Sequence, residues 1–307
     1  MRCTSLADAA ARVRGCGLDP DAVHEIVHEA LAEDLGGRGV LPAGTGAGVD
    51  VTSVATVPAD ATATGHLVAR RPGTVAGTAV AAYALATVAE AAGPFAVETR
   101  VADGAEVVAG DVVMAVTANT RAVLTAERVA LNLLTLMSGT ATATAAWTAA
   151  LAGTSARVRD SRKTVPGLRV LQKYAVRVGG GVNHRMCLAD MALVKDNHVA
   201  AAGGVVPAYR AVRSAFPDLP VQVEVTSLQQ AREVVAAGAD DVLLDNMSPA
   251  EMAEAVRLLG AACTFEASGG LTLADAARIA ETGVDFVAVG AITHSAAILD
   301  IALDLLT

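Results

Sequence analysis

Aromatic residues are scarce in this sequence: one Trp, three Tyr and four Phe make up only 3% of its 307 residues. Proteins that bind single-stranded nucleic acid stack bases on aromatic side chains, and the formal net charge of −9 repels a polyanion. Hydrophobic residues still reach 53%, chiefly as Ala, Val and Leu, which suits helices packed on buried strands. We therefore exclude nucleic acid as a partner and expect one large domain or two around a sizeable core.

Features of secreted and membrane proteins are also sparse. Four cysteines lie far apart without a C-x-x-C pair, which signals neither a zinc site nor a disulfide framework: Cys3, Cys16, Cys187 and Cys263. The N-terminus shows no apolar core of an export signal. The best candidate for a membrane span, Gly73–Val88, is rich in Ala, Thr and Gly and is followed by Glu90. We expect a cytoplasmic protein with reduced thiols that does not enter a membrane.

Lysine is the rarest charged residue, because the chain has only three: Lys163, Lys173 and Lys195. All three lie between residues 157 and 195, a stretch that holds nine of the 23 Lys and Arg residues and only two acids. Lysine supplies a compact, mobile ammonium where arginine supplies a rigid fork, so its use here indicates chemistry. A solvated basic surface is the alternative. A local excess of positive charge in an acidic protein favours a site for small, multiply charged anions.

The first part of the chain predicts an α+β domain. Helical spacing covers Asp21–Leu35, and the glycine-rich Gly36–Asp50 predicts a flexible loop. Short β-like runs then recur from Val51 to Thr117, beginning with TSVATV, and are separated by Pro and Gly turn signals. One helix is predicted within them, at Thr78–Ala91. This pattern indicates an antiparallel sheet.

The rest of the chain has an α/β rhythm. Leu124–Leu151 predicts one or two helices with a break at Gly139, and Thr293–Leu306 predicts a terminal helix. Between them, short apolar runs alternate with helical stretches: Val205–Phe216, Leu228–Ala237, Pro249–Leu259 and Leu273–Glu281. Strands that are apolar on both faces are typical of parallel sheets covered by helices. The number of repeats favours a barrel, and an open doubly wound sheet is the alternative.

Polar residues follow the predicted strands at their C-terminal ends, which is where α/β barrels build active sites. They are Arg162, Lys163, Lys195, Glu224, Asp245, Ser268-Gly269-Gly270 and Gly290. With His184 and Arg185, up to five cationic donors would surround one mouth and grip carboxylates. The alternative is ion pairing with Asp160, Asp190 and Asp196, which are too few to neutralise them all. Weaker candidates are Arg157, Arg159, Arg169, Lys173 and Arg177.

The acids and glycine turns suggest a phosphorylated sugar substrate. Glu224 and Asp245 each end an apolar strand, where acids serve as Mg²⁺ ligands or sugar-hydroxyl acceptors, or hold a neighbouring cation. Ser268-Gly269-Gly270 and Gly290 each precede a predicted helix and offer backbone N–H groups to phosphate. His66, His198 and His294 lack metal-ligand spacing, so we interpret them as structural.

From Thr125 onward the chain resembles the quinolinate phosphoribosyltransferase family. The segments that carry the resemblance are AERVALNLLTLMSGTATAT, DSRKTVPGLRVLQKYAVRVGGGVNHRMCLADMALVKDNH, VEVTSLQQA, VLLDN, EASGG and VAVGAITHS. The resemblance implies transfer of phosphoribosyl from phosphoribosyl pyrophosphate to quinolinate with Mg²⁺, giving nicotinate mononucleotide, CO₂ and pyrophosphate for NAD synthesis. It also implies an N-terminal open-faced sandwich, residues 1–130 joined by a C-terminal helix 293–307, and an incomplete α/β barrel, residues 131–292.

The resemblance also assigns roles. Residues matching Arg162, His184, Arg185 and Lys195 bind the quinolinate carboxylates with Lys163 close by. Lys163, Lys195, Glu224 and Asp245 form the catalytic set, the last two with the ribose and Mg²⁺. Ser268, Gly269, Gly270 and Gly290 hold phosphate, and Arg128 reaches into the partner's site, so a homodimer or larger homo-oligomer is expected.

Two departures from the family pattern stand out. Glu33-Asp34 is separated from Asp50-Val51-Thr52 by the glycine-rich loop, and Ser161 replaces a threonine but keeps the hydroxyl. Two other functions remain open: a related transferase acting on nicotinate or another pyridine acid, and a phosphate-sensing protein without catalysis.

Overall fold

The computed structural model describes residues 1–37 and 48–306. The chain folds into two compact units. The first is made of Met1–Thr142, Pro166–Gly179 and Ala296–Thr307, and the second of Ala143–Val165 and Gly180–Ser295. The first unit therefore takes in an inner segment, Pro166–Gly179, that the expected division at residues 130 and 293 assigns to the barrel.

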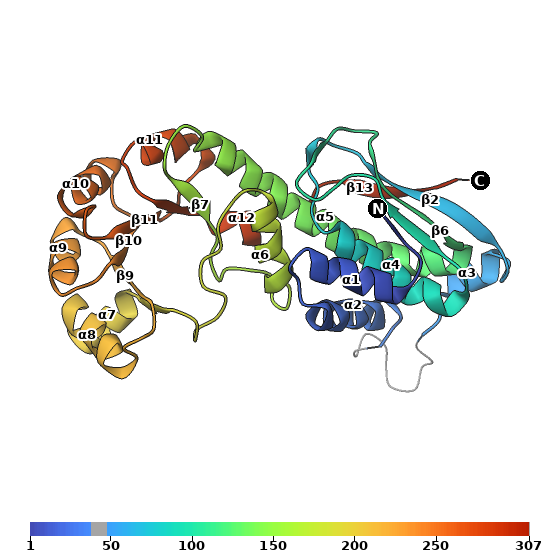
Figure 1. Cartoon of the computed structure of the whole chain (residues 1–307), viewed down its shortest axis with the longest axis horizontal. Helices are drawn as coiled ribbons and strands as arrows, with labels where there is room; N and C mark the ends of the chain where they lie inside the picture. Colours follow the sequence, from blue (N-terminus) through green and yellow to red (C-terminus); the bar gives the residue numbers. More distant parts are fainter. Residues whose placement is uncertain (38–47, 307) are drawn as a thin grey trace. The chain divides into compact units, whose positions relative to one another are not determined.

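The first unit contains an antiparallel sheet of five strands (Figure 1). In spatial order its strands are β1 (Arg2–Cys3), β4 (Ala96–Thr99), β6 (Val112–Asn119), β2 (Thr62–Ala69) and β13 (Ile301–Leu306). A separate two-stranded sheet pairs β3 (Gly73–Thr74) with β5 (Glu106–Val107). The antiparallel sheet that the sequence predicts for this part of the chain is confirmed.

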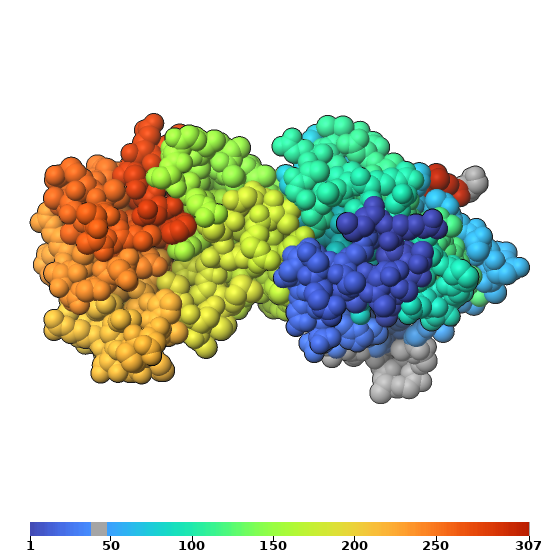
Figure 2. Space-filling model, in the orientation of Figure 1, coloured from blue at the N-terminus to red at the C-terminus, as the bar shows by residue number. Residues whose placement is uncertain are grey.

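The first unit also contains helices α1 (Leu6–Gly15), α2 (Pro20–Asp34) and α4 (Thr78–Ala92), and the N-terminal segment, dark blue in Figure 2, covers part of the face seen there. α4 is the core helix, because nearly all of its first three turns are buried. Its N-terminus is capped by the carboxylate of Asp103, which accepts the N–H groups of Gly77 (2.7 Å) and Thr78 (3.1 Å). The predicted helices at Asp21–Leu35 and Thr78–Ala91 are confirmed.

The first β-like run of the sequence is a helix instead. All of TSVATV except its last residue, the C-cap Val57, lies in α3 (Val51–Thr56). Asp50 explains the difference, because its side chain accepts the backbone N–H of Ser53 at 3.0 Å and so provides an N-cap for the turn. Most of the predicted glycine-rich loop, at residues 38–47, lies outside the described residues.

Helix α5 (Thr120–Ala150) is continuous, so the break predicted at Gly139 is wrong. A Cβ on Gly139 would lie 2.2 Å from the carbonyl oxygen of Ala297, so the glycine allows the returning C-terminal chain to cross the helix closely. By length and composition alone α5 could span a membrane, but 67% of its most apolar window is buried inside the protein. Such burial is ordinary for the core helix of a globular protein.

The C-terminal segment is a strand, and the helix predicted at residues 293–307 is wrong. The short helix α12 (Ala291–His294) ends early, and β13 pairs antiparallel with β2 from Ile301–Ala69 to Leu306–Thr64. A short run of apolar residues fits a helix or a strand equally well by periodicity. The unpaired edge of β2 decides between them, because it offers backbone hydrogen bonds that a helix would leave unmade.

The second unit is an open α/β barrel of six parallel strands. In spatial order the strands are β7 (Arg157–Arg159), β12 (Phe286–Ala288), β11 (Thr264–Ser268), β10 (Asp241–Asp245), β9 (Val221–Val225) and β8 (Ala192–Val194). The helices that follow them along the chain include α7 (Asp196–Ala202), α8 (Val205–Ala215), α9 (Leu228–Ala236), α10 (Pro249–Leu259) and α11 (Ala276–Ala280). The predicted α/β class with an incomplete barrel is confirmed.

Candidate active site

A pocket of about 320 Å³ in the second unit contains half of the predicted site residues, and its lining does not include Glu224, Asp245, Gly269, Gly270 or Gly290. Its lining includes Asp160, Ser161, Arg162, Lys163, His184, Arg185, Leu193, Lys195, Leu243, Glu266, Ser268 and Ala288. All five cationic candidates predicted for the mouth of the barrel are therefore in one cavity. Their grouping follows from the parallel strands, whose C-terminal ends share one rim.

Local backbone pairing brings distant residues together at this rim. Val182 pairs in a parallel bridge with Arg159, the last residue of β7. Because of this bridge, Asn183 and His184 lie next to Asp160. The buried carboxylate of Asp160 accepts hydrogen bonds from the backbone N–H of His184 (2.7 Å) and from the side-chain amide of Asn183 (2.6 Å). The glycines before Val182 thus lead into a turn that sets His184 and Arg185 beside Arg162.

The positive charges of the pocket act on one another. The pKa of Arg185 is lowered, first by burial and then by the nearby charge of Arg162. Two nearby acids also bind the backbone: Asp190, whose charge partly offsets the lowering of the Arg185 pKa, accepts the N–H of Met186 (2.6 Å), and Asp196 accepts that of Asn197 (2.7 Å). A bound dianion would relieve the repulsion between the two guanidinium groups.

Lys195 connects the cationic pocket with the acidic candidate Glu224. Its ammonium lies 2.5 Å from Oε2 of Glu224, across the ends of β8 and β9. The backbone N–H of Lys195 donates to Nδ1 of His198 at 2.9 Å, which fixes the start of α7 immediately after it. The role predicted for His198 agrees with this contact, since the ring orders the backbone at Lys195.

Asp245 ends the neighbouring strand β10 and lies beside the glycine turn after β11. Asp245 and Ser268 are register partners, and Asn246 Nδ2 donates to the Asp245 carboxylate at 2.7 Å. Gly269 has φ +107°, and a Cβ there would lie 2.7 Å from the backbone nitrogen of Asn246. Glycine is therefore required at position 269 for two reasons: its φ is positive, and it closely approaches the backbone that follows β10.

The Gly290 turn packs against Lys163. A Cβ at Gly290 would lie 3.1 Å from Cδ of Lys163 and 3.1 Å from Nε2 of His294. The hydroxyl of Thr293 also donates to the carbonyl of Lys163 at 2.7 Å. His294, interpreted from sequence as structural, is thereby close to a predicted phosphate turn and to a predicted substrate lysine.

Several candidates do not line this pocket. Arg169, Lys173 and Arg177 belong to α6 (Arg169–Val178) in the first unit, where the Lys173 side chain is fully buried. Arg128 is on α5 in the first unit, with a side chain that is 61% exposed and 3.8 Å from Glu127. An exposed arginine on that helix is available to another molecule.

Sequence reasoning missed a polar set below the rim, made of the buried Gln222 and Glu266 and the half-buried Asp241, and gave Arg159 little weight. Gln222 and Glu266 are 0% and 1% exposed. Strand periodicity could have found them, because residues two apart on a strand share a face. Gln222 precedes Glu224 by two residues, and Glu266 precedes Ser268 by two.

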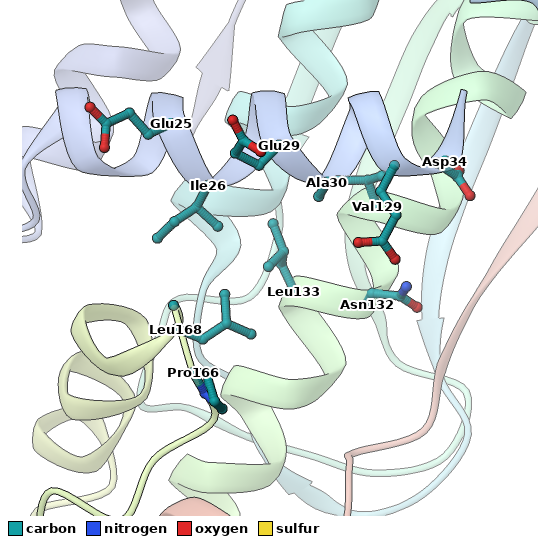
Figure 3. A pocket seen from close by; sticks show the side chains of 12 residues that line it. Glu25, Ile26, Glu29, Ala30, Asp34, Val129, Asn132, Leu133, Pro166 and Leu168 are labelled. Carbon is teal, nitrogen blue, oxygen red and sulfur yellow. The ribbon is translucent and has the colours of Figure 1, made fainter. Parts of the chain in front are cut away.

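A second pocket, of about 620 Å³, lies in the first unit (Figure 3). Apolar side chains from α2, α5 and the segment before α6 form its floor, including Ile26, Leu133 and Leu168, and carboxylates of α2 line its rim. This acidic lining is the wrong charge for an anionic substrate. The second unit therefore holds the candidate active site.

Comparisons with known proteins identify the family of the chain. The family described as "Quinolinate phosphoribosyl transferase, C-terminal domain" matches residues 140–304, and its N-terminal domain matches residues 50–138. The carboxylating nicotinate-nucleotide pyrophosphorylase of Mycobacterium leprae is 50% identical over 288 residues, 93% of this chain and 98% of that protein. The decarboxylating quinolinate phosphoribosyltransferase 2 of Nicotiana glauca is 36% identical and covers 99% of this chain and 89% of its own.

Solved structures show the same architecture. The nicotinate-nucleotide pyrophosphorylase of Francisella tularensis superposes with a TM-score of 0.84 at 34% identity, covering 93% of this chain and 96% of that one. A protein of the same name from Pyrococcus furiosus has a TM-score of 0.65 at 19% identity, which supports the fold alone. By these matches over both of its parts, the chain belongs to the quinolinate phosphoribosyltransferase family.

Proposed function

We propose that this protein transfers the phosphoribosyl group of phosphoribosyl pyrophosphate to quinolinate and releases pyrophosphate and CO₂, which yields nicotinate mononucleotide for de novo NAD synthesis. Membership of a family of such enzymes supports the reaction type. The observation that carries the proposal is the single pocket in which Arg162, Lys163, Arg185 and Lys195 converge beside the Ser268 turn.

Two guanidinium groups and two ammonium groups suit an aromatic ring with two carboxylates. Arginine forks bind carboxylates through paired hydrogen bonds, and such charge-assisted bonds each contribute about 1.5–3 kcal/mol. Arg162 and Arg185 suit this role because their positive charges repel each other, and a bound dicarboxylate would offset that repulsion. Holding the ring by its carboxylates would fix the direction of its nitrogen toward the sugar, which is the positioning that such a transfer needs.

The neighbouring acids and glycine turns suit the activated sugar. Glu224 lies one residue before the end of β9 and Asp245 ends the adjacent strand β10, while the Ser268–Gly270 and Gly290 turns offer backbone N–H groups after the next two strands of the sheet, β11 and β12. Mg²⁺ is usually held by one or two carboxylates together with substrate phosphate oxygens. Glu224 and Asp245 fit that pattern, and the ion would neutralise charge on the departing pyrophosphate.

The chemistry then follows from charge. As the carbon–oxygen bond to pyrophosphate breaks, the ribose gains positive character, and the pyridine nitrogen of a ring held in place attacks the anomeric carbon. Quaternising that nitrogen turns the ring into an electron sink. The adjacent carboxylate leaves as CO₂ with its bonding pair left on the ring carbon, which is then protonated. Lys163 and Lys195 would stabilise the departing charges from the pocket wall.

We further propose that the protein is a cytoplasmic homodimer or larger homo-oligomer with shared active sites. The exposed side chain of Arg128 supports this proposal, because a cation on the first unit could serve the pocket of a second copy. An Arg128→Ala protein should lose activity, and mixing it with a protein defective in Arg162 should restore part of that activity through hybrid dimers. No restoration on mixing, with subunit exchange verified, would contradict shared sites.

A product assay tests the reaction. The purified protein, incubated with quinolinate, phosphoribosyl pyrophosphate and Mg²⁺, should release CO₂, pyrophosphate and mononucleotide in equal amounts. Nicotinate in place of quinolinate separates this function from transfer to a monocarboxylate, because it should give little product. Turnover of nicotinate without turnover of quinolinate would overturn the proposal.

A further inference from the structure

A layer of polar side chains lies one strand step below the candidate active site. Gln222 of β9 and Glu266 of β11 share strand faces with Glu224 and Ser268, and both are almost fully buried. Parallel barrels usually fill this layer with branched apolar side chains. Buried polar groups are costly unless they are bonded, so their presence at this depth calls for a function.

The hydrogen bonds of this layer fix the orientation of the Gln222 amide. Its Nε2 donates to Asp241 Oδ1 at 2.9 Å and to Glu266 Oε2 at 3.3 Å. Arg159 also donates to Glu266 Oε2, at 2.7 Å. Because the amide NH₂ group faces two carboxylates, the amide oxygen must face away from them. That oxygen lies 2.9 Å from Nε2 of His184.

The Gln222 amide in turn determines the protonation of His184. Nδ1 of His184 accepts the backbone N–H of Arg185 at 2.7 Å, so Nδ1 carries a lone pair. The proton of a neutral imidazole is then on Nε2, which donates to Gln222 Oε1. His184 is therefore neutral in this arrangement, and its ring directly orders the backbone of Arg185.

Glu266 offers His184 a competing partner. Its Oε1 is 3.9 Å from His184 Nε2 and makes no hydrogen bond within residues 1–37 and 48–306. The charged groups near His184 include Arg159 on β7, Asp160 after it, Asp241 on β10 and Glu266 on β11, together with the cations that line the same pocket: Arg162, Lys163, Arg185 and Lys195. A ring drawn to Glu266 could take a second proton on Nδ1 and would then lose its bond to Arg185.

We propose that Gln222 is a positioning residue for the transfer reaction. It keeps the ring of His184 in the neutral Nε2–H form, away from Glu266, and thereby holds the backbone from which Arg185 reaches the pocket. This proposal rests on the proposed function for its kinetic consequence, but the hydrogen-bond state of His184 is a property of the protein without substrate.

The first test is spectroscopic. In protein labelled with ¹⁵N-histidine, long-range ¹H–¹⁵N spectra distinguish the two neutral forms and the imidazolium, and a His184→Asn protein assigns the signals. We expect the Nε2–H form for His184 in the wild type, and a mixture of forms in Gln222→Met. An imidazolium or an Nδ1–H form in the substrate-free wild type would overturn the proposal, even if Gln222→Met fails to fold.

The second test is kinetic. Gln222→Met should raise the KM for quinolinate about tenfold, the value of one hydrogen bond, and make it pH-dependent, with the KM for phosphoribosyl pyrophosphate unchanged. Equal changes in both KM values together with a lower Tm would reduce Gln222 to a structural residue and refute the proposal. Gln229→Met is the matched control, because it removes an exposed glutamine that donates to Glu233 at 2.9 Å on α9. It should match the wild type in every measurement.

The two readouts separate this proposal from the proposed function. If the wild type does not convert quinolinate, the function fails while the state of His184 is still measured. If the wild type converts quinolinate but Gln222→Met leaves both the histidine signals and the KM unchanged, only the positioning proposal fails.

Discussion

Replacing Arg162 by alanine should weaken the capture of quinolinate. Arg162 lines the candidate pocket beside Arg185, and each charge-assisted bond to a carboxylate contributes about 1.5–3 kcal/mol. Loss of one clamp therefore predicts a fall in kcat/KM for quinolinate of about 10- to 100-fold. The lower part of that range is expected, because burial and then the charge of Arg162 lower the pKa of Arg185, and removal of Arg162 relieves the second of these effects.

The assay measures kcat/KM for quinolinate at saturating phosphoribosyl pyrophosphate and, separately, the Kd for quinolinate by calorimetry. Arg162→Lys should recover only part of the loss, because it restores the charge without the planar fork. Arg257→Ala is the matched control, since Arg257 is an exposed arginine of α10 paired with Glu254. An Arg162→Ala protein with the kcat/KM of the wild type would refute the placement of the dicarboxylate.

Three further changes test other parts of the structure. Asp245→Asn should raise the KM for phosphoribosyl pyrophosphate and the Mg²⁺ requirement, with the Kd for quinolinate unchanged by calorimetry. Gly269→Ala should destabilise the protein by about 1–3 kcal/mol in denaturant unfolding, because φ is +107° and the added Cβ meets Asn246. Burial raises the pKa of Asp241, so the protonated carboxyl group is more compatible with the folded state than the charged form is. As pH rises through that pKa, the wild type should lose stability relative to Asp241→Asn; a constant difference would contradict this.

The sequence predicted the rim of the barrel well because its signals are local. Apolar strands that end in a polar residue indicated Lys195, Glu224 and Asp245, and the parallel sheet then brought their strand ends together. The same reasoning predicted the helix boundaries of α10 without error. A strand that is buried on both faces and ends in a charged residue can be recognised from a few consecutive residues.

Features that depend on distant partners could not be predicted in this way. The C-terminal segment is a strand because β2 has a free edge, and Gly139 lies within a helix because the chain crosses it near Ala297. His184 was predicted as a cationic donor from its neighbours in sequence, whereas its ring nitrogens contact Gln222 and the Arg185 backbone. Each of these outcomes involves a partner far away along the chain: β2 for the C-terminal segment, Ala297 for Gly139 and Gln222 for His184.

A crystal structure of the protein with quinolinate bound tests the central claim most directly. We predict the ring in the pocket of the second unit, with its carboxylates on Arg162 and Arg185 and its nitrogen turned toward the side where Glu224 and Asp245 end their strands. Quinolinate bound outside that pocket, or within it without contact to either arginine, would contradict the account.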